Sequence, residues 1–425
     1  MGDVWITLIL LFGLMFLGVP VAISIGAAAF LGLWMSGVPF LVIPQRMIAG
    51  VDSFSLLAVP LFLVMGGLLT TSGLTHRLIA FAEGLVGRLR GGLGAVNVTA
   101  NMIMGGMTGS ALAECTMTGS ILIPPMKKAG YSAGYAAALT GSASIVGPLI
   151  PPSIPFIVYG SVFGVSIGQL FLGGFFPGVL VGLLLLVANY IYARRNGIAG
   201  IEVSFAKWRR ESIKAIPVLF ASVVILGGMF GGIFTPTESA AAGVLYVLFI
   251  AIFLYRSITL KKIAVEFAEA AYATAILFAI IAMSSAYGWY LARSEVGTLV
   301  LDLFAPIQDS TILTLLVINL VLLLFGCLLE TFAILFLLVP LFLPLVTKLG
   351  VDPVHFGVIV VLNLNIGLVT PPFGMCMFIG NQIAGSGMRE FSRALIYVFP
   401  ALLIALILVT YIPAVTLWLP TMLAR

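Results

Sequence analysis

Residues 141–152 read GSASIVGPLIPP, and residues 361–372 read VLNLNIGLVTPP. Each stretch places glycine and a pair of prolines in the middle of a hydrophobic segment. Proline removes a backbone donor and clashes with the preceding turn, and glycine weakens a helix, so both segments are predicted to unwind for several residues. Carbonyl groups freed in this way cannot be left facing lipid. The two stretches therefore predict broken helices whose carbonyls have a polar partner inside the protein.

The amino-acid composition is that of an integral membrane protein. Of its 425 residues, 61% are hydrophobic and 8% are charged, whereas soluble globular chains carry about 25% charged residues. Three cysteines and two histidines stand apart from one another in the sequence, so no thiol or imidazole cluster has the spacing of metal ligands. We therefore expect many membrane spans and no transition-metal centre.

The apolar segments are separated by short polar stretches. The opening segment lacks the basic region and the cleavage site of a secretory signal, and it is too long for one, so we expect a retained first span at 4–35. Residues 74–92 form a polar-edged stretch, and residues 194–214 form a basic connector. The other predicted spans and apolar blocks are 54–72, 93–126, 132–165, 170–193, 215–232, 236–255, 266–292, 311–346, 354–384 and 394–420.

The twenty basic residues sort by side of the membrane if the blocks 93–126 and 311–346 each enter and leave on the same side, as re-entrant hairpins. Sixteen then lie on one side and four on the other, which is a strong positive-inside bias. A single crossing by either block would scatter these charges. The arrangement predicts a cytoplasmic N-terminus and a C-terminus on the outer side of the membrane. The sixteen are Arg77, Arg88, Arg90, Lys127, Lys128, Arg194, Arg195, Lys207, Arg209, Arg210, Lys214, Arg256, Lys261, Lys262, Arg389 and Arg393, and the four are Arg46, Arg293, Lys348 and Arg425.

The two quoted stretches belong to an internal repeat with one constant offset, the offset that leads from Gly147 to Gly367. Because the bases of the two hairpins fall on opposite sides, the halves are repeated in sequence and inverted in the membrane, which is an architecture of secondary transporters. We predict an all-α polytopic fold of two inverted repeats, each with a re-entrant hairpin and a broken helix. The other matched positions are Gly106 with Gly326, Pro124 with Pro344, Lys128 with Lys348, Gly130 with Gly350, Pro151-Pro152 with Pro371-Pro372, and Gly160 with Gly380.

The repeat predicts a division of the chain into five parts. Residues 1–92 are the scaffold of the first repeat, and residues 93–165 are one half of a mobile transport domain, with the first hairpin and broken helix. Residues 166–292 hold a connector, an arm and the scaffold of the second repeat. Residues 293–384 are the other half of the transport domain, and residues 385–425 form a C-terminal span.

The working site of such a repeat pair lies where hairpin tips meet broken helices. The first tip, GGMTGSALAE at 105–114, offers the hydroxyls of Thr108 and Ser110, and it faces the carbonyls from Gly147 to Pro152. The second tip, GCLLETF at 326–332, offers Glu330 and Thr331 and faces Asn363, Asn365 and Thr370. Oxygen ligands without a cluster of carboxylates favour a monovalent cation over calcium or magnesium. We predict sodium, with a proton as the alternative.

Several of these residues also have a structural interpretation, which stays open at this point. A proline pair can be a simple kink, and Ser, Thr or Asn on a membrane helix can serve helix packing. Glu330 is expected to be functional because an acid at membrane depth is costly, yet it can also belong to a structural pair. Glu114 can pair with a helix N-terminus, and Glu238 can lie in the first turn of a helix capped by Thr235 or Thr237.

Four stretches carry a family resemblance. Residues 91–160, from GGLGAVNVTANMIMGGMTGSALAE to PPSIPFIVYG, closely resemble the large membrane subunit of tripartite ATP-independent periplasmic (TRAP) transporters, the dicarboxylate-type permease family. GGIFTPTESAA at 231–241, GLVTPPFG at 367–374 and YIPAVTLWLP at 411–420 look like the same family. At the first tip, many members carry a shorter acid or a proline after an SGS-like turn, whereas this chain reads TGSALAE, with Thr108 in the serine position. The hydroxyl is kept, so the cation interpretation holds, but substrate identity does not carry over.

The resemblance implies an elevator-type fold of the ion-transporter superfamily and a sodium-coupled importer in the bacterial inner membrane. Such a subunit works with a small four-helix membrane subunit, here expected to be a separate polypeptide, and with a periplasmic binding protein that delivers an organic acid. It implies cations at Thr108, Ser110, Gly147, Ile150, Pro152, Leu328, Glu330, Gly367, Thr370 and Pro372. The residues expected to contact substrate are Ser110, Ser153, Glu330, Thr331, Asn363 and Asn365. C4-dicarboxylates, sialic and other sugar acids, and sulfonates all remain possible substrates.

Three rival classes of protein compete with this one. A channel needs a continuous ring of pore-lining groups, and the sequence offers paired half-helices instead. An intramembrane enzyme needs a nucleophile beside a base, and no histidine accompanies Ser110 or Ser153, so we expect no enzyme and no cofactor beyond the coupling ion. A sodium- or proton-coupled transporter of the same superfamily that works without a binding protein is the remaining alternative.

Overall fold

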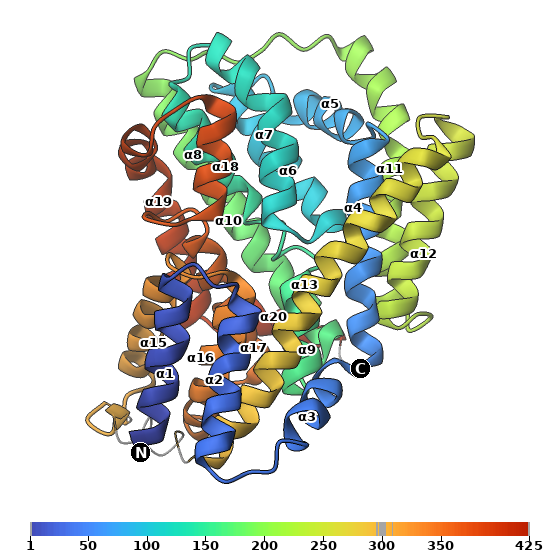
Figure 1. Cartoon of the computed structure of the whole chain (residues 1–425). Helices are drawn as coiled ribbons and strands as arrows, with labels where there is room; N and C mark the ends of the chain where they lie inside the picture. Colours follow the sequence, from blue (N-terminus) through green and yellow to red (C-terminus); the bar gives the residue numbers. More distant parts are fainter. Residues whose placement is uncertain (1, 295, 297–302, 308, 424–425) are drawn as a thin grey trace.

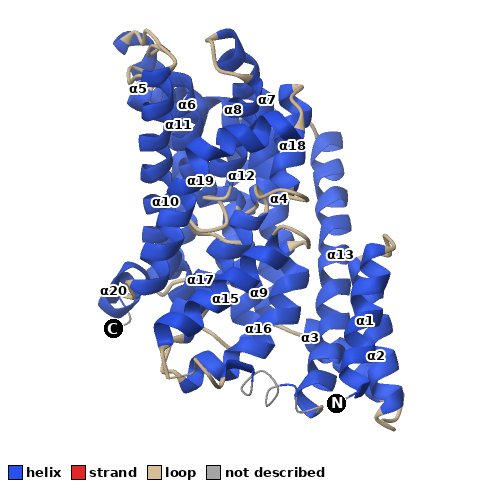
Figure 2. Cartoon of the chain, turned by 90° about the vertical axis from the view of Figure 1, so that its left-hand side faces the viewer, coloured by secondary structure: helices blue, strands red, loops and turns tan. Residues whose placement is uncertain are grey.

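The computed structural model describes residues 2–294, 296, 303–307 and 309–423, so Arg425 lies outside it. The described residues form helices and connecting loops, with no strand among them (Figure 2). Seven helices in this part of the chain are long and apolar enough to cross a membrane. The others are shorter, which agrees with an architecture built around half-spans. This confirms the predicted all-α polytopic class.

Two helical hairpins point toward each other from opposite ends of the molecule. In Figure 1, α6 and α7 descend from the top to mid-height, and α15 and α16 rise from the bottom. The bounds of these helices agree with the repeat offset within two positions. The hairpins are α6 (Gly92–Thr108) with α7 (Ala111–Lys128), and α15 (Thr311–Gly326) with α16 (Thr331–Lys348).

Each quoted stretch interrupts a pair of short helices. Glycine and proline end the first helix of each pair, and the second begins after the double proline, because proline cannot continue the preceding helix. The loops lie at mid-height among the helices in Figure 2. The broken helices predicted as 132–165 and 354–384 are therefore confirmed. Their halves are α8 (Ala133–Ser144) with α9 (Ile154–Phe163), and α17 (Pro353–Gly367) with α18 (Met375–Ala384).

Two long helices pack against the hairpins and broken helices. The helix α10 contacts α6, α8, α9 and α17, and α19 contacts α8 and α17, while α10 and α19 also contact each other. The C-terminal segment, predicted as one span, breaks before Pro413 into α19 and a short α20 that rests on α10. The bounds are α10 (Ile167–Arg195), α19 (Met388–Tyr411) and α20 (Ala414–Leu423).

The remaining helices form the flank of the molecule. The long α13 packs on α2 and α3, and α4 packs on α12, so the helices of one repeat pack on those of the other (Figure 1). A short 3-10 turn at Phe54–Leu57 precedes α4, and a π-helical turn at Ile250–Leu254 follows α12. The bounds are α1 (Gly2–Phe16), α2 (Val21–Met35), α3 (Val42–Val51), α4 (Ala58–Thr71), α5 (Thr75–Val86), α11 (Phe205–Phe230), α12 (Pro236–Phe249) and α13 (Leu260–Arg293).

The prediction of a single first span at 4–35 was wrong. The structure has two antiparallel helices in contact, α1 and α2, so the N-terminus lies at the same end of the molecule as the base of the second hairpin (Figure 1). The turn between them contains Gly18 in a left-handed conformation, with a φ of 82°, followed by Pro20. One helix over 4–35 would be about 48 Å long, far more than the hydrocarbon core requires. No basic residue precedes Arg46, so charge did not reveal the error.

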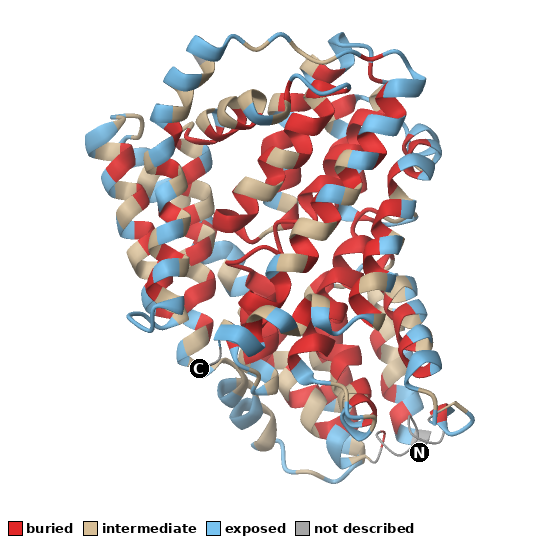
Figure 3. Cartoon of the chain, turned by 180° about the vertical axis from the view of Figure 1, so that it is seen from behind, coloured by how far each residue is buried: buried red, intermediate tan, exposed pale blue. Residues whose placement is uncertain are grey.

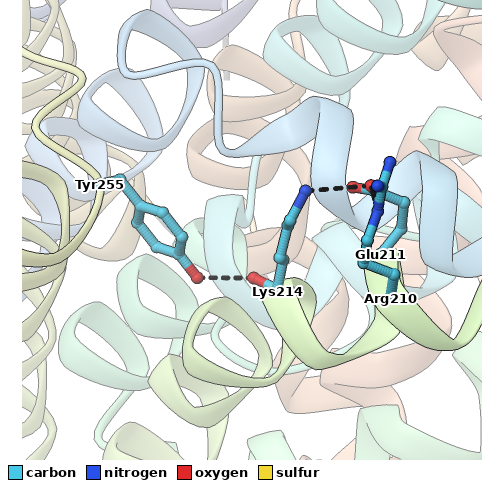
Figure 4. A network of polar contacts seen from close by, with 4 residues as sticks. All are labelled: Arg210, Glu211, Lys214 and Tyr255. Carbon is cyan, nitrogen blue, oxygen red and sulfur yellow. Dashed lines mark hydrogen bonds and ion pairs between the residues drawn. The ribbon is translucent and has the colours of Figure 1, made fainter.

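The basic connector is partly helical. The connector was predicted to extend over 194–214, but α11 begins at Phe205 and not at the predicted 215, so the last part of the connector belongs to this helix. Within it, Glu211 accepts from Lys214 at 3.1 Å and pairs with Arg210 at 3.4 Å. The phenol of Tyr255, which follows the π-helical turn, donates to the carbonyl of Lys214 at 2.5 Å (Figure 4). These contacts tie the end of the connector to the loop before α13.

Burial is concentrated where the two halves meet. Figure 3 shows the buried residues in the middle of the molecule, over the hairpins and broken helices, with exposed residues along the outer helices. Large apolar side chains are exposed on this outer surface, among them Phe16, Leu245 and Phe253. Such residues suit contact with lipid, which confirms that the chain is a membrane protein.

Candidate functional site

A cavity of about 350 Å³ lies between the two hairpin tips and the flanking helix α13. Its wall contains the first residues of four helices: α7, α9, α16 and α18. The positive end of a helix dipole, equivalent to about half an elementary charge, is at its N-terminus. No lysine or arginine is among the described residues of the wall. The cavity thus offers positive potential from four backbone ends and none from side chains. The polar lining residues are Ser110, Glu330, Thr331 and Asn365.

The caps of these helices explain which polar groups reach the cavity. Ser110 caps α7 by accepting from the backbone N–H of Ala113 at 3.4 Å. Ser153 caps α9 in the same way, accepting from Phe156 at 3.3 Å. At the equivalent place on α16, the side chain of Glu330 forms no capping hydrogen bond. Its carboxylate is therefore available to the cavity that it lines.

The first hairpin tip is packed directly on the first broken helix. Thr108 is buried and donates its hydroxyl hydrogen bond to Glu114. The carboxyl group of Glu114 lies over Gly147, where a Cβ atom would come within 2.3 Å of Oε1. On the other side of the tip, a Cβ on Gly109 would come within 2.6 Å of the Pro152 carbonyl oxygen. Thr108, Gly147 and Pro152, predicted as cation residues, are thus brought together.

Glu114 is the residue that sequence reasoning left out of the site. It is fully buried, and its Oε2 has no hydrogen-bond partner among the described atoms, although Oε1 receives the Thr108 hydroxyl. An acid at membrane depth without a full set of partners is costly and by default functional. The repeat offset gives Ile334 at the equivalent place in the second half. The sequence signal for Glu114 was its position one helical turn after Ser110, on the inner face of the hairpin.

The second tip is packed on the second broken helix even more closely. A Cβ on Gly367 would lie 2.4 Å from the carbonyl carbon and oxygen of Gly326. The carbonyl of Cys327 accepts from the backbone N–H of Phe373 at 3.2 Å. Thr370 donates to the carbonyl of Ile366 at 2.8 Å, which leaves its oxygen able to accept or to coordinate. At this tip backbone meets backbone, whereas at the first tip the Glu114 side chain lies over Gly147.

The other predicted cation residues have different surroundings. Ile150 is buried, and a Cβ on Gly178 would come within 2.6 Å of its side chain. Leu328 lies in the turn of the second tip, half-buried. Pro372 is exposed at the loop after α17. Any role of these three residues would be through backbone carbonyls.

The two asparagines of the second broken helix point in different directions. Asn365 lines the cavity, and its amide donates to the carbonyl of Val361 at 2.8 Å. Asn363 instead donates to Asn319 of α15, at 2.7 Å to the side-chain oxygen, and Asn319 donates to Thr410 of α19 at 3.0 Å. Asn363 therefore joins helices, which was its structural interpretation. Ser153, a predicted substrate residue, is fully buried as the N-cap of α9 and does not line the cavity.

Glu238 has a structural role. Thr235 accepts from the backbone of Glu238, and the Glu238 carboxylate accepts from the Thr235 backbone at 2.8 Å, which is a complete capping box for α12. This places Glu238 at the exposed start of a flanking helix. The sequence left Thr235 and Thr237 open as the capping residue, and in the structure Thr235 caps the helix.

The fold and the cavity define a membrane transporter of the inverted-repeat type. Residues 8–415 match the family described as the DctM component of tripartite ATP-independent periplasmic transporters. The chain is 39% identical over 415 residues to the sialic acid TRAP transporter large permease protein SiaM of Vibrio cholerae, with 96% of each chain covered. It is 38% identical over 370 residues to the C4-dicarboxylate TRAP transporter large permease protein DctM of Pseudomonas aeruginosa, with 87% of each covered.

The chain therefore belongs to the DctM family of large TRAP transporter permeases. This confirms the resemblance, and it confirms that the protein is a transporter component and not an enzyme. The fold is also similar to the crystal structure of the Alcanivorax borkumensis YdaH transporter, with a TM-score of 0.50, 14% identity, and coverage of 88% of this chain and 87% of that one. That similarity concerns the fold alone.

Proposed function

We propose that this chain is the permease of a sodium-coupled importer that takes up an organic acid anion through the cavity between its hairpin tips. The observation that carries the proposal is the convergence of four helix N-termini on a cavity without a basic side chain among its described lining residues. Helix N-termini bind carboxylates through their free N–H groups and their dipoles. Ser110, Thr331 and Asn365 supply neutral donors beside them. An anion of the sugar-acid or dicarboxylate class fits this chemistry, in keeping with the names of the two relatives.

The first cation site is proposed between the first tip and the first broken helix. Thr108 and Glu114 supply a hydroxyl and a carboxylate, and the loop from Gly147 to Pro152 supplies carbonyls. One carboxylate with neutral oxygens favours a monovalent cation over calcium or magnesium, which recruit more charge. The second site is proposed from the carbonyls and side chains of Leu328, Glu330, Gly367, Thr370 and Pro372.

The proposed cycle moves the hairpins and broken helices relative to the flanking helices. Cation binding draws a tip onto its broken helix and completes the anion site, because bound positive charge favours a carboxylate. Glu330 faces the anion, so its role is to hold the second cation or to accept from a hydroxyl of the substrate. The cavity with its bound anion then moves across the membrane together with the hairpins and broken helices, as in other inverted-repeat transporters.

The proposed setting is the bacterial inner membrane, together with a small membrane subunit and a periplasmic binding protein. The sixteen basic residues assign the first hairpin's base to the cytoplasm. Because α1 and α2 form a hairpin, the N-terminus lies on the opposite face (Figure 1). We therefore propose that residue 2 and the end of α20 are both periplasmic, in place of the cytoplasmic N-terminus expected from a single first span.

Reconstitution tests the function as a whole. The permease is purified with its small subunit, placed in proteoliposomes, and given radiolabelled sialic acid or succinate with the binding protein from the same genome. We expect uptake to rise at least about tenfold when an inward sodium gradient replaces a potassium gradient, since a coupled step draws on that gradient. Uptake that needs no binding protein would favour the alternative superfamily transporter. Uptake driven by a proton gradient alone would show that the coupling ion is a proton and not sodium.

The cation sites are tested by two threonine substitutions. Thr108→Ala and Thr370→Ala each remove one oxygen donor, so we expect the sodium concentration for half-maximal uptake to rise by about tenfold, the equivalent of about 1.4 kcal/mol of binding free energy. Thr116→Ala is the matched control, because Thr116 is exposed and bonds back to Leu112 of its own helix at 2.9 Å. An unchanged sodium dependence in both variants would refute the assignment.

A further inference from the structure

The tip of the first hairpin is held by a side chain from a flanking helix. Ser222 of α11 donates its hydroxyl hydrogen bond to the carbonyl of Gly106 at 3.0 Å. Gly106 lies in the last turn of α6, where helix carbonyls lack partners within the helix. Lipid cannot supply such a partner at membrane depth. The hydroxyl of Ser222 therefore satisfies a carbonyl that the hairpin itself leaves open.

This bond differs from the usual behaviour of hydroxyls on membrane helices. Thr140 and Thr274 bond back to the carbonyl four residues earlier, each at 2.7 Å, as such side chains commonly do. Ser222 reaches across to another helix instead. A glycine favours this approach, because a Cβ on Gly106 would lie 3.2 Å from the Ser222 oxygen, which is a tight contact. The contact is thus a close hydrogen-bonded contact between α11 and the first hairpin.

The two tips differ in what holds them. The carbonyl of Cys327 at the second tip accepts from the backbone of Phe373, which belongs to the adjoining broken helix. Both of those residues lie on the same side of the proposed division between moving and flanking helices. Gly106 and Ser222 lie on opposite sides of it. A displacement of the hairpins against α11 would therefore keep the bond at the second tip and break the bond to Ser222.

We propose that Ser222 is a positioning residue that holds the first hairpin tip against the flanking helices in the conformation seen here and releases it when the hairpin moves. The inference rests on the proposed function, because it requires that movement. It follows that the Gly106 carbonyl exchanges partners during the cycle. Removing the hydroxyl should therefore shift the balance between conformations without changing the residues that hold cation or substrate.

The test measures that balance directly in the complex with its small subunit. Cys115, Cys327 and Cys376 are replaced by alanine, and spin labels are attached at Leu245 on the flanking helix α12 and at Leu320 on α15 of the second hairpin, which are 68% and 57% exposed. Distances between the labels are measured by pulsed electron resonance in lipid nanodiscs, with and without sodium. We expect Ser222→Ala to lower the share of the conformation seen here by about threefold, a typical effect of one interhelical hydrogen bond in a membrane.

Two comparisons keep the result decisive. Ser222→Thr keeps the hydroxyl and Ser222→Val has the shape of that variant without it, so this pair repeats the test at constant volume if the alanine variant does not fold. Ser239→Ala removes a buried hydroxyl of α12 that has no partner among the described atoms, and it should leave the distances unchanged. Equal distributions for Ser222→Val and Ser222→Thr would overturn the inference. A single distance in the unsubstituted protein under all conditions would overturn the proposed movement itself.

Discussion

Replacing Gly367 by alanine is expected to reduce sodium-dependent uptake by at least about tenfold. The new Cβ would lie 2.4 Å from the carbonyl carbon and oxygen of Gly326, a separation that heavy atoms do not tolerate. The opposing atoms are backbone and cannot rotate away, so the second hairpin tip must lift from its broken helix. Overpacking of this kind typically costs about 1–3 kcal/mol, and the middle of that range, about 2 kcal/mol, corresponds to a change of roughly thirtyfold. The measurement is initial uptake into proteoliposomes at saturating sodium.

The control for this variant is another glycine inside a helix. Gly288→Ala introduces the same methyl group on α13, where no atom of another helix lies within 4 Å of the new Cβ. Alanine favours a helix over glycine by about 0.5–1 kcal/mol, so this variant should be folded and active. Wild-type uptake by Gly367→Ala would show that the two backbones do not need to meet, and the proposed second cation site would lose its geometry.

Replacing Glu114 by glutamine is expected to abolish the stabilisation of the protein by sodium. The glutamine keeps the volume and can still accept from Thr108, but it removes the carboxylate charge at a fully buried place beside Gly147. A ligand at about one hundred times its Kd stabilises a protein by about 2.7 kcal/mol. We therefore expect sodium to raise the unfolding temperature of the unsubstituted protein in detergent, relative to equal potassium. The glutamine variant should unfold at the same temperature in both salts.

Two outcomes separate a cation ligand from a structural acid at this position. If Glu114 only supports packing, the glutamine variant changes the unfolding temperature equally in sodium and in potassium, and the difference between the salts persists. Asn319→Leu serves as the matched buried polar substitution, since Asn319 bonds to Asn363 and Thr410 away from the cavity. It should lower stability in both salts alike and leave the sodium effect intact.

The core of the fold was predictable because its signals are local. Glycine and the proline pairs interrupt the helical segments at 147–152 and 367–372, and the constant offset between the two halves showed that the two interruptions are equivalent. The N-terminal hairpin was missed for an equally physical reason. Its turn carries Gly18 and Pro20, but the segment has no basic residue to report which side its ends occupy.

The candidate site was predictable only in part. Thr108 and Gly147 belong to recognisable interruptions, so their meeting followed from the repeat. Glu114 did not, because an acid in the first turn of a helix is also what a dipole alone would favour. Its place in the site shows only once Gly147 is packed under its carboxylate. Asn363 and Asn365 are close neighbours in the sequence, and only tertiary packing separates the helix-joining residue from the one in the cavity.

The convergence of four helix ends on one cavity has a consequence for how the protein responds to acid. A lysine or histidine in a binding site can lose its charge as the pH changes, whereas a peptide dipole carries no exchangeable proton. The attraction that α7, α9, α16 and α18 exert on an anion is therefore constant across the pH range in which the chain is folded. Among the described residues that line the cavity, Glu330 alone has a side chain that titrates. Sensitivity of anion uptake to pH would then come from that carboxylate, from Glu114 at the proposed first cation site and from the cargo, while the attraction of the helix ends for negative charge stays constant.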